Sequence, residues 1–456
     1  MAKEKVTIGN EGIYDARQLG MPKMITLGLQ HMFAMFGATV LVPALTGLSV
    51  SATLLFAGLG TLLFHFLAKG KVPAFLGSSF AFLAGYEMIT GKYGTPDFDA
   101  SKLPYACLGV ACAGLLYLVL AALVKAFGAK KVMSFFPPVV TGPIIIAIGL
   151  TLSSSAINNC KANWLVAVVA IAIVVVCNIW GKGMIKIVPI IFGVIGSYIV
   201  AVIMGDVDFS KVMEADWVGL PFQPSETVFS IFKNPDASLI VTAIITIMPI
   251  AIATMVEHIG DISAISSTVG KNYIEEPGLH RTLLGDGLAT TIASLFGAPA
   301  NTTYGENTGV LSLTKVYDPR VIRIAAYFAI FFSFSPKFAA LVSSMPTATI
   351  GGVSLVLYGM ISAVGVRNVV ENKVDFTKNR NVIIAALILV LSIGIKFTSV
   401  YNAADEEVIA SGISFAIGSV NISLSGLAVA AIVGIVLNAI LPGKDYDFGD
   451  EAAKEE

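Results

Sequence analysis

The stretch NTTYGENTGV, residues 301–310, decides how the rest of this chain is interpreted. It lies between strongly apolar stretches, yet it carries the carboxylate of Glu306, two asparagines, three threonines and two glycines. Irregular, polar backbone at membrane depth is tolerated only where it is buried in protein or lines a cavity. The stretch therefore predicts a polar site inside a membrane protein.

The composition supports a membrane location. The 456 residues are 56% hydrophobic and only 13% charged, and the mean hydropathy is +0.82. Because so few charges could not cover a soluble domain this apolar, we expect a polytopic membrane protein in contact with the lipid bilayer. A net charge of −1 without any basic block excludes a nucleic-acid partner. The four cysteines form no CxxC pair and no metal-ligand cluster stands out, so we expect no metal, no cofactor and no intramembrane enzyme.

Apolar stretches of about 20 residues, the length that crosses the hydrocarbon, define twelve predicted spans. They lie at 25–46, 50–68, 104–126, 135–153, 163–180, 185–204, 238–260, 283–298, 321–343, 349–365, 380–397 and 421–441. Two further stretches, 73–90 and 299–318, are too short or too polar for ordinary helices, and we interpret them as broken spans 3 and 10 of fourteen. With both termini in the cytoplasm, most of the 29 lysines and arginines then lie on the cytoplasmic side, as the positive-inside rule requires.

The two halves of the chain also resemble each other. QH at 30–31 corresponds to EH at 257–258, and the same offset of 227 moves LGSSFAF (76–82) onto TYGENTG (303–309). A proline and a glycine five residues apart recur at 137–142 and 346–351. Since each half has seven spans, an odd number, the pattern predicts 7+7 inverted repeats, the construction of many secondary transporters.

This topology divides the chain into five segments. They are a cytoplasmic N-terminal tail (1–24), a first repeat (25–204), an extracellular loop (205–237), a second repeat (238–442) and a cytoplasmic C-terminal tail (443–456). The fold class is therefore an all-α polytopic membrane protein of fourteen spans, and the family resemblance described below implies short extended segments in broken spans 3 and 10.

Broken spans at equivalent positions of the two repeats point to one site near the bilayer midplane. The N-terminal ends of half-helices direct free N–H groups at a polar ligand there. The backbone amides near Phe80 and Gly305 are the candidate donors, and Ser79 and Tyr304 complete this part of the predicted substrate site. The alternative is that these segments are only kinked helices packed against their neighbours.

Three carboxylates inside predicted spans are candidates for function, because a charge at the bilayer centre costs ~2.5–3.5 kcal/mol. Glu257 and Asp261 are four residues apart and share one helical face. Two carboxylates this close resist joint ionisation, so we predict that the pair holds a proton and titrates as a unit, with Glu306 a further candidate. Alternatively, Asp261 is hydrated at the cytoplasmic end of its helix, and Glu306 makes a structural hydrogen bond to Thr302 or Tyr304.

Other polar residues in the spans give weaker signals. A lone histidine in an apolar helix is more often a packing residue than a ligand, and we interpret His31 in this way. Gln30, His31 and Asn307 are expected to support the site. Asp286 lies near the start of a span, where a basic loop residue is its candidate partner, and the sequence assigns it no function.

Several motifs in order resemble one transporter family. They are QHMFAMFGATVLVP (30–43), GSSFAF (77–82), EH (257–258), PGLHR (277–281) and NTTYGENTGVLSLTK (301–315). Together they resemble the nucleobase/ascorbate transporter (nucleobase:cation symporter-2) family, and are most similar to its bacterial uracil permeases, over residues 20–442. The resemblance implies a core domain of spans 1–4 and 8–11, a gate domain of spans 5–7 and 12–14, proton symport, homodimers and a place in the bacterial cytoplasmic membrane.

The resemblance also implies roles for individual residues. Acidic side chains at Glu257 and Glu306 would hold the polar edge of a pyrimidine, backbone amides at Phe80 and Gly305 would complete the site, and Tyr358 would face the substrate from the gate domain. One departure matters: uracil permeases of the best-known type carry a histidine where this chain has Asp261. The identity of the proton carrier is therefore open.

The leading prediction is a proton-coupled uracil importer. Uracil offers two N–H donors and two carbonyl acceptors, so carboxylates can accept from it while backbone N–H groups donate to it. One alternative is a xanthine or purine symporter of the same family. Another is an anion transporter of the sulfate-permease type, which would require a positively charged side chain where this chain has Glu306.

Overall fold

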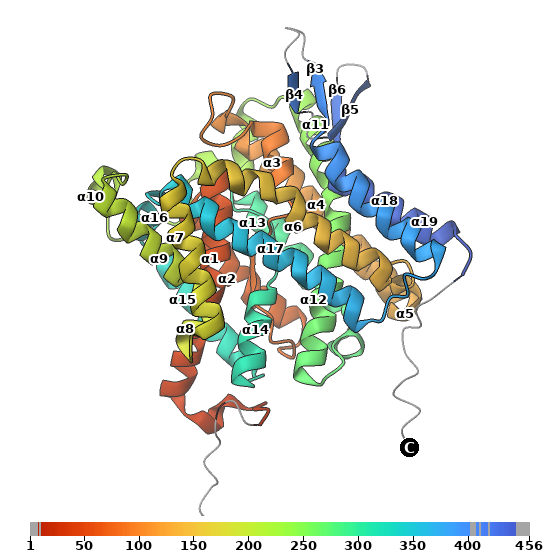
Figure 1. The fold of residues 1–456 in the computed structure, drawn as a ribbon, viewed down its shortest axis with the longest axis horizontal. Coiled ribbons are helices and arrows are strands. Elements are labelled where there is room, and N and C mark those ends of the chain that lie inside the picture. Colours follow the sequence, from red (N-terminus) through yellow and green to blue (C-terminus); the bar gives the residue numbers. More distant parts are fainter. Residues whose placement is uncertain (1–7, 9–10, 402–406, 410–411, 418–419, 444–456) are drawn as a thin grey trace, which may run out of the picture.

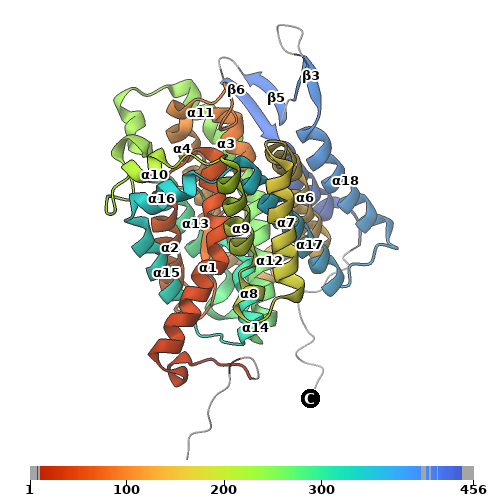
Figure 2. The ribbon, with the colours of Figure 1, turned by 60° about the vertical axis from the view of Figure 1, so that its left-hand side comes forward.

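Helices dominate the computed structural model, which describes residues 8, 11–401, 407–409, 412–417 and 420–443 (Figures 1 and 2). The helices of the first half are α1 (Met21–Thr46), α2 (Val50–Leu67), α3 (Leu83–Thr90), α4 (Leu103–Phe127), α5 (Ala129–Met133), α6 (Pro138–Cys160), α7 (Trp164–Trp180), α8 (Met184–Ile187) and α9 (Pro189–Met204). Those that follow are α10 (Ser210–Glu214), α11 (Ala237–Ile247), α12 (Ala251–Val269), α13 (Leu279–Leu295), α14 (Gly305–Thr314), α15 (Pro319–Ser333), α16 (Pro336–Ser343), α17 (Thr347–Glu371), α18 (Asn379–Lys396) and α19 (Gly426–Ile440). The strands are β1 (Leu76–Ser78), β2 (Asn301–Thr303), β3 (Ser399–Tyr401), β4 (Glu407–Ile409), β5 (Gly412–Ile417) and β6 (Val420–Ser425).

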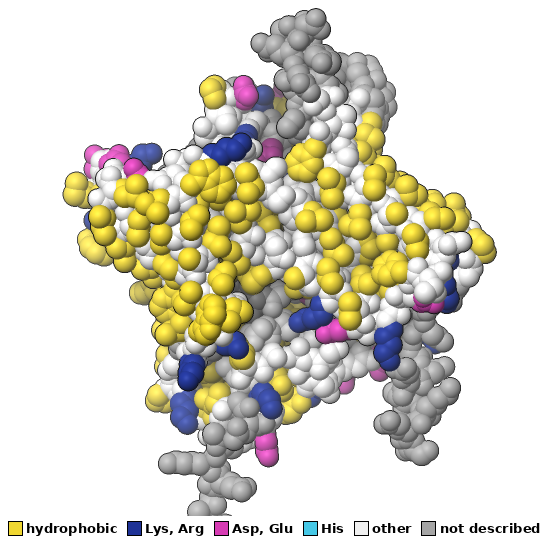
Figure 3. Space-filling view, in the orientation of Figure 1, with side chains coloured by type: hydrophobic (Ala, Val, Ile, Leu, Met, Phe, Trp, Pro, Cys, Tyr) yellow, Lys and Arg dark blue, Asp and Glu magenta, His cyan; other side chains and the backbone are white. Residues whose placement is uncertain are grey.

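The helices and the surface are those of a multi-pass membrane protein. Seven helices in the described part of the chain are long and apolar enough to cross a membrane, and an eighth crossing results if α15 and α16 count as one span. Figure 3 shows hydrophobic side chains across the middle of one face, with charged side chains toward its upper and lower ends. Such an apolar band between charged ends matches the hydrocarbon layer of a bilayer.

One predicted span is bent rather than straight. The stretch predicted as a single span at 321–343 forms α15 and α16, which meet at an angle of 90°. Pro336 lies in the first turn of α16 and cannot continue the preceding hydrogen-bond ladder, while the Ser335 side chain accepts a hydrogen bond from the Phe338 amide and caps the new helix. A local break therefore overrides the continuous apolar pattern.

The C-terminal span starts later than predicted. In the stretch predicted at 421–441, β6 ends at Ser425, whose side chain caps α19, and the helix begins only at Gly426. Strand β6 pairs antiparallel with β5, and β3 pairs with β4. The all-α prediction is therefore wrong in this part of the chain, because the alternating and β-branched residues of VNISLS favour a hairpin over a first helical turn.

The two polar stretches meet inside the protein. Strand β1 precedes α3, strand β2 precedes α14, and the strands pair antiparallel with Leu76 opposite Thr303 and Ser78 opposite Asn301. All six residues are buried. The pairing satisfies backbone groups that would otherwise lack partners within the bilayer. It also brings together segments that are far apart in the sequence.

The helices pack in two groups. The first group consists of α1, α2, α4, α13 and α15: α2 packs against α13 and α15, α13 packs against α4, and α1 packs against α15. The second group consists of α6, α7, α17, α18 and α19: α17 packs against α6 and α7, and α18 packs against α6 and α19. Glycines allow α6 and α17 to approach closely: a Cβ at Gly149 would lie 2.2 Å from the Tyr358 carbonyl oxygen, and one at Gly365 would lie 2.6 Å from the Ile146 nitrogen. Pro137 and Pro346 precede the first residues of these two helices, at matching positions.

The described part of the predicted N-terminal tail packs on the protein. The Ile13 amide donates to the Lys315 carbonyl at 2.7 Å, and the Ala16 amide donates to Asp318 Oδ2 at 2.8 Å. Asp15 accepts from Arg17 Nη2 at 2.7 Å. The segment therefore ties the start of α1 to the turn between α14 and α15.

Candidate functional site

A cavity of about 310 Å³ lies beside the paired strands. It falls in the size range of small-molecule sites. Polar and backbone groups from β1, β2, α12 and α14 line one side, and apolar residues of α9 and α17 line the other. Among the lining residues are Ser78, Phe80, Glu257, Asp261, Tyr304 and Gly305 on the polar side, and Ile190, Met360 and Ile361 on the apolar side. The cavity thus lies where the two groups of helices meet.

A glycine in β1 makes room for the tyrosine that precedes α14. The Tyr304 hydroxyl donates to the Ser78 carbonyl at 2.9 Å and is 3.3 Å from Thr39 Oγ1, which can donate to it. A Cβ at Gly77 would lie 2.5 Å from the Tyr304 ring, closer than real contacts allow. Because Gly77 has no side chain, the Tyr304 ring can occupy its place in the cavity wall.

Two backbone amides of the wall are available to a ligand. Helix α14 begins at Gly305 without a side-chain cap from Tyr304, and α3 begins without one from Phe82. In the described part of the chain, neither the Phe80 nor the Gly305 N–H donates to a protein acceptor. A Cβ at Gly305 would meet nothing within 4 Å, so the backbone there borders open space. Helix N-termini favour acceptors and negative charge.

Two carboxylates of α12 line the same cavity. Glu257 is partly buried, and Asp261 is only 8% exposed. Asp261 Oδ2 accepts a hydrogen bond from Thr303 Oγ1 at 2.8 Å, which ties α12 to β2. Asp261 is therefore enclosed and bonded in the protein rather than hydrated at a helix end. The backbone of Glu306 lies in the first turn of α14, but its side chain lies outside the part of the chain that the structure describes.

A buried His–Asp pair connects α12 to α13. His258 Nδ1 is 2.7 Å from Asp286 Oδ2, and both side chains are completely buried. The rings of Phe64 and Tyr117 lie edge-on to His258, with centroids 6.4 Å away. The expectation that Asp286 pairs with a basic loop residue is wrong, because α13 carries it inward against α12. Sequence analysis missed this pair, since nothing in the spacing of the two residues indicates contact.

Several of the predicted site residues are not among those that line the cavity. Tyr358 is 2% exposed and packs edge-on against Phe80, with ring centroids 5.6 Å apart. The Ser79 side chain is buried, and its amide donates to the Ala300 carbonyl at 2.8 Å. Ser78 occupies the wall instead. Gln30 is buried in α1.

The supporting residues of α1 and α14 contact each other. Asn307 Nδ2 donates to the His31 carbonyl at 3.2 Å and lies 3.2 Å from His31 Nδ1. The contact ties α14, whose N-terminus faces the cavity, to α1. Two polar residues of the wall, Asn178 in α7 and Lys186 in α8, were not predicted, because only packing between helices distant in the sequence brings them to the cavity.

A polar cavity enclosed by membrane-crossing helices, with no described group of metal-binding side chains, is typical of a membrane transport protein. Residues 22–400 match the profile of the permease family Xan_ur_permease. The chain belongs to this family, which confirms the resemblance to nucleobase/ascorbate transporters, and it is a transporter rather than an enzyme.

Known proteins and structures agree with this assignment. The chain is 39% identical over 456 residues to the uracil permease of Bacillus subtilis, covering 97% of each sequence. It is 41% identical over 429 residues to the uracil permease of Bacillus caldolyticus, covering 92% of each. The transmembrane domain of a cyanobacterium bicarbonate transporter, BicA, has a similar fold, with a TM-score of 0.59, 17% identity, and coverage of 84% of this chain and 97% of that one. At that identity the structural match concerns the fold alone.

Proposed function

We propose that this chain is a symporter that imports uracil together with protons by alternating access. The observation that supports this most strongly is the pairing, in one cavity, of acceptor carboxylates with backbone amides that have no acceptor among the described residues. The names of the relatives support uracil as the substrate.

The cavity wall complements the polar edge of uracil. Glu257 accepts from a ring N–H, and the Phe80 and Gly305 amides donate to the carbonyl oxygens. Glu306 is a second acceptor in this proposal. The edge-on contact with Tyr358 holds the Phe80 ring in place. A buried acceptor that loses its donor is costly, so a ring without the matching N–H binds poorly.

The proton is carried by the carboxylates of the cavity. Glu257 and Asp261 lie one helical turn apart, and joint ionisation in this enclosed space is unfavourable. Asp261 takes the place of the usual histidine, and the hydrogen bond from Thr303 fixes its orientation. A membrane potential supplies ~2.3 kcal/mol per charge per 100 mV to drive entry of the proton.

The proposed architecture has fourteen spans as 7+7 inverted repeats, with β1–α3 and β2–α14 as broken spans 3 and 10. The two packing groups support a division into a core domain of spans 1–4 and 8–11 and a gate domain of spans 5–7 and 12–14. Movement of the core against the gate then exposes the cavity to each side in turn. We place the protein in the bacterial cytoplasmic membrane as a homodimer, with both termini and residues 1–24 and 443–456 in the cytoplasm and the loop 205–237 outside.

A second candidate function is anion transport. The presence of Lys186 in the cavity wall favours it, because a cation attracts an anion. The carboxylates Glu257 and Asp261 in the same wall oppose it, because each repels an anion. A purine such as xanthine is an alternative substrate for the same symport mechanism.

Binding of labelled uracil to the purified protein tests the site. We expect Glu257→Gln to abolish detectable binding, and the exposed Glu371→Gln, a matched control outside the cavity, to bind as wild type. Asp261→Asn should retain binding but lose the dependence of uptake on a proton gradient. Unchanged binding in Glu257→Gln would contradict the site, and displacement of the label by xanthine or bicarbonate at lower concentrations than by unlabelled uracil would favour the alternatives.

A further inference from the structure

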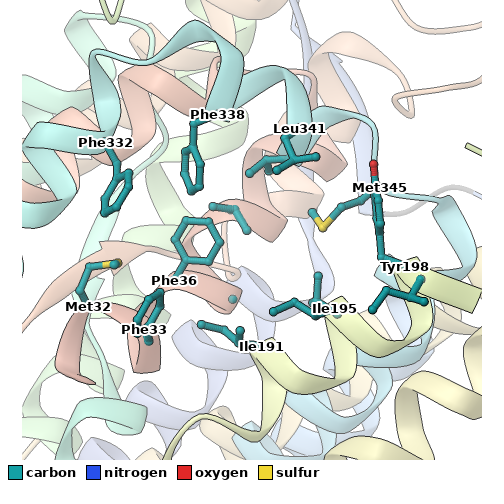
Figure 4. A pocket seen from close by; sticks show the side chains of 15 residues that line it. Met32, Phe33, Phe36, Ile191, Ile195, Tyr198, Phe332, Phe338, Leu341 and Met345 are labelled. Atoms are coloured by element: carbon teal, nitrogen blue, oxygen red, sulfur yellow. The ribbon is translucent and has the colours of Figure 1, made fainter. Parts of the chain in front are cut away.

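A second cavity, of about 350 Å³, lies between α1, α9 and the bent pair α15–α16 (Figure 4). Figure 4 shows Phe332 and Phe338 on one side of an open space and Ile191 and Ile195 on the other. Its lining includes Met32, Phe33, Val194, Ile195, Leu341 and Val342.

The wall of this cavity is hydrocarbon. Its one side-chain hydroxyl among the described lining residues, that of Tyr198, is 2.7 Å from Ser344 Oγ and so has a protein partner. No charged side chain or histidine is among those lining residues. A water molecule needs two to four polar partners, and apolar cavities of this kind stay dry and bind apolar molecules. Uracil would lose hydrogen bonds there without replacement. The cavity therefore suits an aliphatic ligand.

The rim of the cavity opens toward the lipid. Ile195 is 50% exposed, Ile199 53% and Leu341 41%, although the deeper residues Met32 and Val342 are only 2% and 5% exposed. Exposed aliphatic side chains on membrane-crossing helices face the hydrocarbon, and the molecules present there are lipid acyl chains. We propose that this cavity is a binding site for one acyl chain of a bilayer phospholipid, which enters past Ile195 and Leu341.

The two cavities share a wall. Phe33 lines both the apolar cavity and the candidate substrate cavity, and the adjacent residues Ile190 and Ile191 line the substrate and the apolar cavity respectively. A bound acyl chain packs against Phe33 and limits its movement away from the substrate cavity. The effect on Phe33 and the substrate cavity rests on the proposed function, whereas the binding of the acyl chain does not.

Photolabelling tests the site directly. The protein is reconstituted in vesicles that contain a phosphatidylcholine with a diazirine in its acyl chain, irradiated and mapped by peptide mass spectrometry. We expect label on the deep residues Met32 and Val342, which bulk lipid cannot reach, as well as on exposed Val390 of α18. Label confined to exposed residues, with none on Met32 or Val342, would overturn the proposal.

A filling variant gives an independent measurement. In Val194→Phe the added phenyl group displaces at least two methylenes of the chain, so labelling of Met32 should fall about tenfold. Val390→Phe, a matched change on the lipid-facing surface of α18, should leave it unchanged. Equal labelling of Met32 in Val194→Phe and wild type would contradict the assignment, and the wild-type map decides alone if that variant does not fold. Because labelling needs neither uracil nor a gradient, failure of uracil binding would leave this result intact.

Discussion

Replacing one member of the His258–Asp286 pair should lower the free energy of unfolding more than replacing both members with apolar residues. The two groups are 2.7 Å apart and completely buried, so Asp286→Leu leaves the imidazole without its partner and without water. Leaving one buried polar group without its hydrogen-bond partner in this way costs about 1–3 kcal/mol of unfolding free energy. In the double variant His258→Phe/Asp286→Leu, the new ring lies among the edges of Phe64 and Tyr117 and no polar group remains, so the cost should be below about 1.5 kcal/mol.

The assay is denaturant unfolding of the purified protein in mixed micelles. Ser294→Ala is the matched control, because Ser294 is a buried side chain of the same helix whose hydroxyl has no partner in the described part of the chain. We expect the control to change the unfolding free energy by less than about 0.5 kcal/mol. A double variant as unstable as Asp286→Leu, or a single variant as stable as the control, would show that His258 and Asp286 do not depend on each other for stability.

Two further predictions concern the site and the N-terminal segment. Gly77→Ala places a Cβ 2.5 Å from the Tyr304 ring, so we expect a loss of about 1–3 kcal/mol of unfolding free energy and weaker uracil binding. In the control Gly394→Ala nothing lies within 4 Å of the new Cβ, so stability and uracil binding should both be unchanged. The hydrogen bond from the Arg17 side chain lowers the pKa of Asp15 to about 2. Because this folded pKa lies below the ordinary value of about 3.9, the contact stabilises the segment above pH 4 and is lost as the pH falls toward 2. The hydrogen-exchange protection of residues 11–19, relative to the intrinsic exchange rate at each pH, should fall over this pH range in the wild type but not in Asp15→Asn.

Much of the fold follows from hydropathy alone. Apolar length locates long helices such as α1 and α4 to within a few residues, because burial in lipid and protein dominates their energetics. The bend before Pro336 and the β5–β6 hairpin escape the same argument. Both depend on local caps and pairing that an averaged hydropathy does not register.

The candidate site was predictable where a residue breaks the apolar pattern. Glu257 and Asp261 stand out as charges within spans, and the polar stretch around Gly305 stands out as irregular backbone; the structure brings all three to one cavity. Lys186 could not be predicted, because its place in the wall depends on packing between distant helices. The same holds for the pair of Asp286 with a histidine on another helix.

Uptake of labelled uracil into proteoliposomes with an imposed inward proton gradient tests whether this protein is a uracil–proton symporter. We expect accumulation that requires the gradient, collapses when a protonophore dissipates it, and persists in the presence of excess xanthine. Accumulation without any gradient dependence would contradict proton coupling. Absence of uracil uptake by folded, reconstituted protein would contradict the proposed substrate.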